Sequence, residues 1–241
     1  MTSSKEAWEQ EASNWAAWAR TASHDAFHQF RDAFFGEIVP PPGRATLEIG
    51  CGEGRVAREL RDRGHRVTAI DASPTLLELA RAADPDGEYV VADAAELPFA
   101  DAAFDLVVAH NSLMDFDDVP GSVAEAARVL EPGGTFAISV VHPMTDAGRW
   151  EGRDPDAAFV IRGSYFGTRR VEDHVARDGL EITFHGWSHP LETYAHALEE
   201  AGFVVTRIRE PAMPEAYVAA DPGEGRWLRL PNFLHVRARK E

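Results

Sequence analysis

One stretch of the chain constrains its fold more than any other: Gly50, Gly52 and Gly54 stand at alternate positions between an apolar run and a helical pattern. The apolar run at 45–49 is typical of a buried strand, and the apolar spacing after Arg55 is typical of a helix. Glycine accepts positive φ and lets a ligand approach the backbone. Because the first N–H groups of a helix lack partners within it, the stretch predicts a nucleotide-type pocket at this junction.

The register of the glycines distinguishes between possible ligands. A dinucleotide-binding turn needs the pattern G-x-G-x-x-G. Gly50 and Gly52 fit that pattern, but Arg55 occupies the place of its third glycine. The register therefore disfavours an NAD-dependent oxidoreductase, which stays as an alternative. A tight turn that binds no ligand is the other alternative.

Strand and helix patterns alternate along the following sequence. Strands are predicted at 66–71, 89–93, 104–110, 135–141, 203–209 and 233–239. Helices are predicted from 55 to about 64, from 74, over 121–130 and from about 190 to Gly202, and Glu131–Gly134 is predicted to be a turn. Such alternation indicates an α/β fold with a parallel sheet and right-handed crossovers. Ligands of such open sheets bind at the carboxyl ends of the strands.

Two segments depart from this alternation. Residues 6–38 read as helical, and 142–188 are polar with short apolar runs, which favours an inserted β hairpin or ribbon over the mouth of the pocket. We therefore predict four parts, an N-terminal helical lid or arm, a cofactor-binding core, an insertion that caps the active site, and the C-terminal part of the core sheet. They span 1–42, 43–143, 144–188 and 189–241, respectively.

Composition narrows the class of protein. The chain has 241 residues, 44% of them hydrophobic, which suits one α/β domain with additions. The formal net charge of −16 argues against a nucleic-acid partner. No apolar run approaches the roughly 18–20 residues that span a bilayer, and the first residues lack the apolar segment of a signal peptide. We expect a cytoplasmic monomer or homodimer without a membrane partner, and the single cysteine, Cys51, allows no internal disulfide.

Several short motifs follow one another in a specific order. They are Glu48 with the three glycines, Asp71 ending the second predicted strand, Asp93-Ala94-Ala95 after the third, Phe104-Asp105-Leu106-Val107 in the fourth, and Arg128-Val129-Leu130-Glu131-Pro132-Gly133-Gly134 before the fifth. Asp71 lies 21 residues beyond Gly50, where an acidic residue that binds a ribose diol is expected. In this order the motifs resemble class I methyltransferases that depend on S-adenosylmethionine (SAM).

The resemblance implies a Rossmann-like fold, with a seven-stranded, mostly parallel sheet of order 3-2-1-4-5-7-6, an antiparallel seventh strand and helices on both faces. It also implies a cofactor site. Around the methionine end of SAM would lie Trp15, Glu48, Gly50, Cys51, Gly52 and Gly54. Around the ribose and adenine would lie Asp71, Ala72, Leu76, Asp93, Ala94 and Ala95, and beside the sulfonium His110, Asn111 and Ser112.

The implied activity is methyl transfer from SAM to an oxygen or nitrogen atom of a small molecule, with a carbon acceptor disfavoured. The reaction is an in-line displacement, for which the protein supplies alignment and sometimes a base. Histidine has a pKa suited to that role. We expect His142 first, then His189, with His110 as a third candidate. The alternative for each is a solvated or capping histidine.

Acceptor-binding residues are predicted in the insertion, at Tyr165, Phe166, Trp187 and His185. With Trp15, Trp18 and Phe27 the aromatic residues could form an acceptor cage, although core packing explains them equally well. No N-P-P-[YF] motif follows the fourth strand, which disfavours nucleic-acid bases and protein glutamine as acceptors. No metal site is expected, since the histidines and acids lack ligand spacing. A SAM-fold cyclase or decarboxylase and a non-enzymatic regulator stay as alternatives.

Overall fold

The computed structural model describes residues 2–21 and 24–241. The helices are α1 (Ser4–Arg20), α2 (Phe27–Glu37), α3 (Arg55–Asp62), α4 (Pro74–Ala83), α5 (Val119–Val129), α6 (Pro143–Asp146), α7 (Leu191–Glu200) and α8 (Glu215–Ala220), with the 3₁₀ turns η1 (Leu113–Asp115) and η2 (Pro222–Leu228). The strands are β1 (Thr46–Ile49), β2 (Val67–Asp71), β3 (Glu88–Val91), β4 (Phe104–His110), β5 (Leu130–Val141), β6 (Gly148–Trp150), β7 (Phe159–Ile161), β8 (Arg169–Arg177), β9 (Leu180–Ser188), β10 (Phe203–Arg209) and β11 (Phe233–Lys240). Within these residues no helix combines the length and apolar character that a membrane crossing needs.

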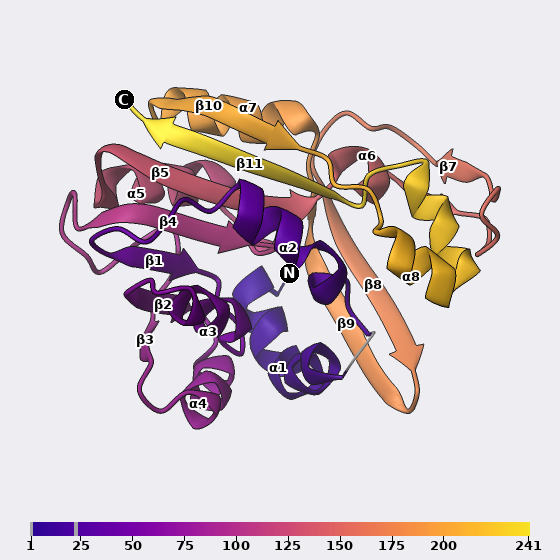
Figure 1. The fold of residues 1–241 in the computed structure, drawn as a ribbon, viewed down its shortest axis with the longest axis horizontal. Coiled ribbons are helices and arrows are strands. Elements are labelled where there is room, and N and C mark those ends of the chain that lie inside the picture. The colour runs from indigo at the N-terminus through magenta and orange to yellow at the C-terminus, as the bar shows by residue number, and fades with distance from the viewer. Residues whose placement is uncertain (1, 22–23) are drawn as a thin grey trace.

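Seven strands form the central sheet in the order β10-β11-β5-β4-β1-β2-β3 (Figure 1). β1 pairs in parallel with β2 and β4, β2 with β3, and β4 with β5, whereas β11 is antiparallel to β5 and β10. This is the predicted order 3-2-1-4-5-7-6. The strand numbers differ because β6 to β9 come between β5 and the last two strands of the sheet. The α/β fold class and the antiparallel closing strand are therefore confirmed.

Helices cover both faces of the sheet because the strand side chains alternate in direction. In β4, Leu106 and Val108 pack in the core layer that includes α2, α3 and α4. Val107 and Ala109, on the opposite face of β4, pack in the layer that includes α5 and α7. The alternation places His110, at the end of β4, on the same face as Leu106 and Val108.

The segment between β5 and α7 forms two separate two-stranded sheets, β6–β7 and β8–β9. β8 and β9 are joined by Asp178 and Gly179, which both have positive φ (52° and 82°) as a two-residue hairpin turn requires. The hairpin extends away from the central sheet and lies alongside α1 (Figure 1). The N-terminal helix and the insertion thus lie together, beside the carboxyl ends of the parallel strands.

Two details differ from the prediction. The helical pattern over 6–38 is interrupted, because α1 ends at Arg20, where the extended Thr21 (ψ 121°) follows, and α2 begins only at Phe27. Glu131–Gly134 is not a separate turn but lies within β5, whose pairing with β4 jumps from Leu130 to Thr135. The residues between bulge out of the ladder, where Gly133 takes a φ of 80°.

His235 on β11 is a buried polar residue in the core. It has no exposed surface, and its ring lies 5.3 Å from that of Phe34. Neither ring nitrogen has a hydrogen-bond partner among the residues that the structure describes. Burial lowers the pKa of His235 from 6.5 to about 4. The folded protein therefore holds this imidazole neutral at a pH where the unfolded chain protonates it.

Acid sensitivity of folding should follow from this residue. Below pH 6.5 His235 is protonated in the unfolded chain, whereas in the folded protein it becomes protonated only near pH 4. The free energy of unfolding therefore decreases as the pH falls from 6.5 to about 4. Between pH 7 and 5, wild type is expected to lose about 2 kcal/mol more unfolding free energy than His235→Leu. Urea denaturation of both proteins at the two pH values measures the difference. Equal losses would contradict the assignment.

Candidate functional site

The strand–turn–helix junction has the predicted backbone conformation. β1 ends at Ile49, and Gly50, Gly52 and Gly54 all have positive φ, at 71°, 55° and 82°. A Cβ on Gly50 would lie 2.5 Å from that of Ser112, and one on Gly54 would lie 2.8 Å from the Tyr89 hydroxyl. These two glycines are therefore needed for close packing within the protein.

Gly52 differs from the other two glycines because, within the described part of the chain, Trp15 of α1 is the one residue close to the position of its Cβ. A Cβ there would lie 3.1 Å from the Trp15 indole nitrogen, which is the nearest side-chain atom to that position. Both residues line the same cavity. The middle glycine thus leaves space for a ligand between the turn and the N-terminal helix.

Asp71, at the end of β2, is fixed by backbone donors. The N–H of Gly52 donates to its Oδ2 at 2.7 Å, and the N–H of Ser73 donates to its Oδ1 at 2.9 Å. Burial raises the pKa of Asp71 above its usual range despite these hydrogen bonds. Asp93, beyond the end of β3, is held in a comparable way by the N–H of Ala95 at 3.0 Å and by Lys5 at 3.3 Å. Two oriented carboxylates thus stand at neighbouring strand ends.

Glu48 is a buried acid that lacks a cation. It lies on β1 with 1% of its surface exposed, and its Oε2 has no hydrogen-bond partner among the described residues. Burial, with the nearby charges of Asp71 and Glu53, raises the pKa of Glu48 to about 8. Glu53, which is equally buried, is instead paired with Arg58 at 2.9 Å and Arg20 at 3.1 Å. The pocket therefore contains one carboxyl group that a cationic ligand would stabilise.

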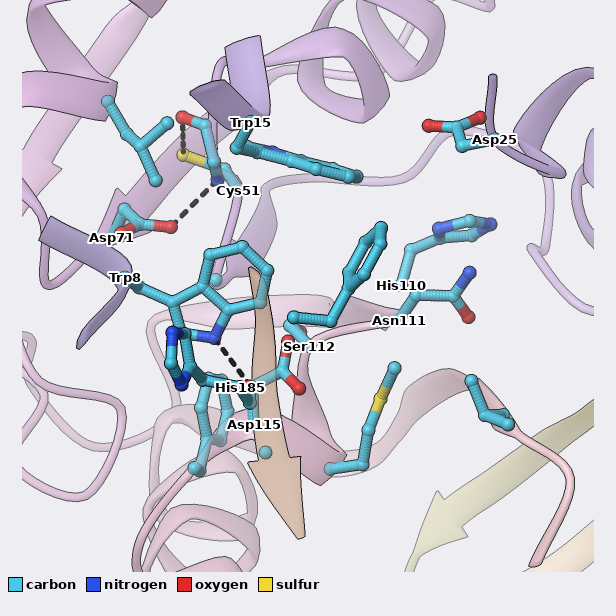
Figure 2. Close-up of a pocket in the computed structure, with 18 of the residues that line it drawn as sticks. Trp8, Trp15, Asp25, Cys51, Asp71, His110, Asn111, Ser112, Asp115 and His185 are labelled. Atoms are coloured by element: carbon cyan, nitrogen blue, oxygen red, sulfur yellow. Dashed lines mark hydrogen bonds between the residues drawn. The ribbon is translucent and has the colours of Figure 1, made fainter. Parts of the chain in front are cut away.

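These groups line a cavity of about 720 Å³ (Figure 2). Of the predicted cofactor residues, all but Gly54 and Ala95 line it: Trp15, Glu48, Gly50, Cys51, Gly52, Asp71, Ala72, Leu76, Asp93, Ala94, His110, Asn111 and Ser112. The cavity also reaches β8 and β9 of the hairpin and η2 near the C-terminus. It is thus long enough to border the glycine turn, the N-terminal helix and the insertion at once.

The three candidate histidine bases lie in different places. His110 lines the cavity and contacts the rings of Phe27 and Phe34 edge-on, at 5.5 and 4.8 Å. Burial lowers its pKa well below 6.5, so it is neutral at physiological pH. His142 and His189 do not line the cavity. These two rings lie farther along the chain, at the start of α6 and just before α7.

Both of those rings have structural contacts. The Nδ1 of His142 accepts from the N–H of Met144 at 3.2 Å and caps α6, while its Nε2 lies 2.9 Å from a carboxylate oxygen of Glu210. The Nδ1 of His189 lies 3.0 Å from the Thr168 hydroxyl, and burial lowers the pKa of this ring. The capping role expected as the alternative is therefore present at His142.

Two of the four predicted acceptor residues line the cavity, and two lie outside it. Trp187 and His185 line the cavity, and the Trp187 indole donates to Asp117 at 3.1 Å. Tyr165 instead accepts a hydrogen bond from the N–H of Leu191 at 2.9 Å, and Phe166 is 78% exposed. Neither Tyr165 nor Phe166 reaches the cavity, because both lie in the loop that precedes β8.

Sequence reasoning named Trp15, Trp18 and Phe27 as candidates for an acceptor cage, and all three line the cavity, but it missed Trp8, Phe184 and Asp115. Four aromatic rings form what we call the aromatic cluster, with centroids 5.9 to 6.4 Å apart in contacting pairs. Its members are Trp8, Trp15, Trp18 and Phe184. Trp8 precedes Trp15 by two helical turns, a spacing that could have indicated a shared face. Asp115, in η1, also lines the cavity, and nothing in the sequence separates it from the neighbouring Asp117 and Asp118.

Known proteins resemble the chain in both sequence and structure. Residues 47–138 match the Methyltransferase domain family. A malonyl-[acyl-carrier protein] O-methyltransferase of Serratia marcescens is 37% identical over 100 residues, which are 42% of this chain and 39% of that relative. An uncharacterized methyltransferase of Synechocystis sp. is 29% identical over 187 residues, or 76% of each chain. The chain spans only 39% to 52% of the length of the malonyl relatives that it matches.

The structural similarity extends over most of the chain. The crystal structure of an S-adenosylmethionine dependent methyltransferase from Mesorhizobium loti superposes with a TM-score of 0.72 at 27% identity, and the match covers 88% of this chain and 98% of that one. The domain match includes the glycine turn and the ends of β2, β3 and β4. Residues 47–138 therefore form a methyltransferase domain, and the chain shares its fold over most of its length with S-adenosylmethionine-dependent methyltransferases, whose cofactor is SAM.

Proposed function

We propose that the protein transfers the methyl group of SAM to an oxygen or nitrogen atom of a small molecule, either free or linked to a carrier protein. The unpaired Glu48 carboxyl beside the glycine turn is the observation that carries this proposal, because SAM is a cationic ligand. A nucleotide with a pyrophosphate would instead meet the acids Glu48, Asp71 and Asp93 in the same cavity. The acidic groups of the cavity thus favour the cationic SAM over NAD, whose pyrophosphate they would repel.

The residues present also suit the rest of the cofactor. Glu48 and the backbone around Gly52 would hold the methionine end, Asp71 the ribose hydroxyls and Asp93 the adenine amino group. Asp71 is preset for this role by the two backbone N–H groups that fix its carboxylate. Bound SAM supplies an electrophilic methyl group and a neutral leaving group. The chain has to orient the acceptor against that methyl group and exclude water.

We further propose that the 1–42 segment acts as a lid and the 144–188 segment as a cap over this site. Their contacts support the assignment. The indole of Trp8 in α1 donates to the His185 carbonyl in β9 at 2.9 Å, and Arg170 in β8 donates to the Thr2 carbonyl at 2.7 Å. Two segments distant in sequence thereby cover the cavity together, and the core at 43–143 and the closing part at 189–241 provide the sheet beneath.

The relatives favour oxygen as the atom that is methylated, since several are malonyl-[acyl-carrier protein] O-methyltransferases. A carboxylate oxygen is already deprotonated at neutral pH, but a hydroxyl oxygen has to lose a proton, and for such an acceptor a positioned base typically contributes about 10²- to 10⁴-fold to the rate. Of the three candidate histidines, His110 is the one that lines the cavity. We therefore rank His110 above His142 and His189 as the proton acceptor.

Single alanine variants of the three histidines test this ranking. His110→Ala is expected to lower kcat by at least roughly 100-fold while leaving the affinity for S-adenosylhomocysteine (SAH) within a few-fold of wild type. His142→Ala should retain turnover and lose about 1 kcal/mol of stability, the usual cost of a helix cap. Turnover, calorimetric SAH binding and urea denaturation of each variant separate these effects. A large kcat loss confined to His142→Ala or His189→Ala would reverse the ranking.

Product analysis tests the proposed function itself. Incubation with SAM and a panel of hydroxylated, amino and thioester-linked acceptors should yield SAH and a product heavier by one methyl group, both detectable by mass spectrometry. A protein that uses the same pocket as a cyclase or decarboxylase would bind SAM but accumulate no SAH. That result would reject methyl transfer and retain the cofactor site.

A further inference from the structure

Among the described residues that line the cavity, unpaired carboxyl groups are present, but every lysine and arginine has an acidic partner. Lys5, Arg55 and Arg226 are the lysine and arginine residues that line it within the described chain, and each already has an acidic partner. Lys5 lies 3.3 Å from Asp93, Arg55 is paired with Asp25, and Arg226 lies 3.6 Å from Glu224. No unpaired lysine or arginine among these lining residues is thus available for an anionic acceptor.

Most of the lining carboxylates are engaged as well. Hydrogen bonds or ion pairs from protein groups hold Asp25, Glu53, Asp71, Asp93, Asp117, Asp146 and Asp173. Glu48 and Asp115 differ, because Glu48 has one buried oxygen without a partner, and no hydrogen bond from a described residue is among the causes that set the pKa of the Asp115 carboxyl. Glu48 lies beside the glycine turn and suits the cofactor. Asp115 is then the lining acid that is left to bind a group of the acceptor.

Asp115 occupies the part of the cavity beneath the hairpin. It ends η1, which follows the carboxyl end of β4, and it faces Gly186 of β9 so closely that a Cβ on Gly186 would lie 2.5 Å from its Oδ1. Figure 2 shows its carboxyl group close to Ser112 and to His185 of the hairpin. Burial, with the charges of Asp146 and Asp71, raises the pKa of Asp115 well above its usual range. A cation bound here would remove that penalty.

Aromatic rings add a second attraction for a cation. The aromatic cluster of Trp8, Trp15, Trp18 and Phe184 lines the same cavity, and so does Trp187, which lies two residues beyond His185 in β9. The face of an indole or phenyl ring attracts a cationic nitrogen within about 6 Å. Unpaired carboxyl and aromatic faces together form the kind of environment that binds an ammonium group.

We infer that the methyl acceptor carries a basic nitrogen, and that the Asp115 carboxylate binds this nitrogen beneath the β8–β9 hairpin. The inference rests on the proposed function and adds the chemical class of the acceptor. Asp115 acts in it as a specificity residue. A carboxylate-bearing acceptor would meet unpaired acids in the cavity and no free lysine or arginine among the described residues that line it.

The test compares probes of one carbon skeleton in the full-length protein saturated with SAH. Arylalkyl amines such as tyramine, the matching arylalkanoic acids, and malonyl-coenzyme A as a carrier-type acid are titrated calorimetrically into wild type, Asp115→Asn and Asp62→Asn. Asp62, exposed at the end of α3, controls for the loss of one negative charge outside the cavity. We expect wild type and Asp62→Asn to bind amines in preference to acids, and Asp115→Asn to bind the same amines at least tenfold more weakly.

Titration with SAH before the probes are added distinguishes a failure of this inference from a failure of the proposed function. Equal SAH affinity in wild type and Asp115→Asn, with amine binding lost only in the variant, supports the inference. Weaker SAH binding by Asp115→Asn would place Asp115 in the cofactor site and overturn it. A preference for the acids, unchanged amine binding by Asp115→Asn, or no amine binding across the panel would also overturn it while leaving the proposed function intact. Failure of wild type to bind SAH would instead reject the proposed function.

Discussion

Gly52→Val is expected to weaken SAH binding by at least roughly 100-fold, the largest single effect that the structure predicts. Gly52 holds a φ of 55°, which a β-branched residue adopts only at a cost. The new side chain would also point at the Trp15 indole, 3.1 Å from the position of its Cβ, and would fill space that the ligand needs. Displacement of the turn would in addition disturb the 2.7 Å hydrogen bond from Gly52 to Asp71. Calorimetric titration with SAH measures the loss.

Gly202→Val is the matched control for that variant. Gly202 follows α7, also has a positive φ (75°), and has no atom within 4 Å of the position of a Cβ. The same substitution should therefore cost backbone strain, seen as a lower melting temperature, without altering SAH affinity. If both variants lost SAH affinity equally, general destabilisation rather than the glycine turn would explain the result.

Glu48→Gln should reduce the loss of stability of the unliganded protein as the pH rises and should weaken the binding of SAM and SAH. Because the pKa of Glu48 is raised from 4.5 to about 8 in the folded protein, the unfolded chain releases this proton first as the pH rises. The unliganded wild type therefore loses stability between pH 4.5 and 8, and Glu48→Gln avoids that loss. From pH 5 to pH 8, wild type is expected to lose roughly 3 kcal/mol more than the variant. The variant should also bind SAM and SAH at least about tenfold more weakly, because it lacks the carboxylate that would pair with the ammonium group at the methionine end of both ligands.

Urea denaturation at both pH values, with and without SAH, measures the two effects together. Glu53→Gln provides a control of opposite sign, because Glu53 is equally buried but is paired with Arg58 and Arg20. Its neutralisation should destabilise the protein, because the buried Glu53 side chain would lose its ion pairs with these two arginines. Glu48→Gln behaving like Glu53→Gln would show that Glu48 has a partner within the protein and would remove the main support for a cationic ligand.

The central fold could be predicted from the sequence because its signals are local. The glycine spacing at 50–54, the apolar runs of β1, β2 and β4, and the acids at strand ends each depend on a few consecutive residues. β4 and β10 begin and end where the apolar pattern places them. The resemblance to methyltransferases supplied the predicted cofactor residues, and all of them except Gly54 and Ala95 line one cavity in the structure.

The acceptor side could not be predicted in the same way, because it is made by contacts between distant segments. Trp8 and Phe184 come together only when α1 packs against β9, which brings their ring centroids within 6.4 Å. His142 and Tyr165 looked suitable by residue type, yet helix capping and a loop contact with α7 use their polar groups. Asp115 carries no local signal, since its isolation from hydrogen-bond donors depends on where the hairpin lies.

The most direct measurement of the central claim is calorimetric titration of SAM and SAH into wild type and Asp71→Ala. Saturable binding of both ligands to wild type is expected. Asp71→Ala should weaken it by about 1–3 kcal/mol, the usual cost of removing hydrogen bonds to a charged group. This loss follows because Asp71 is held by Gly52 and Ser73 at the end of β2, where the ribose would bind. Absence of binding to wild type would contradict the cofactor assignment, and equal binding by both proteins would contradict the role given to Asp71.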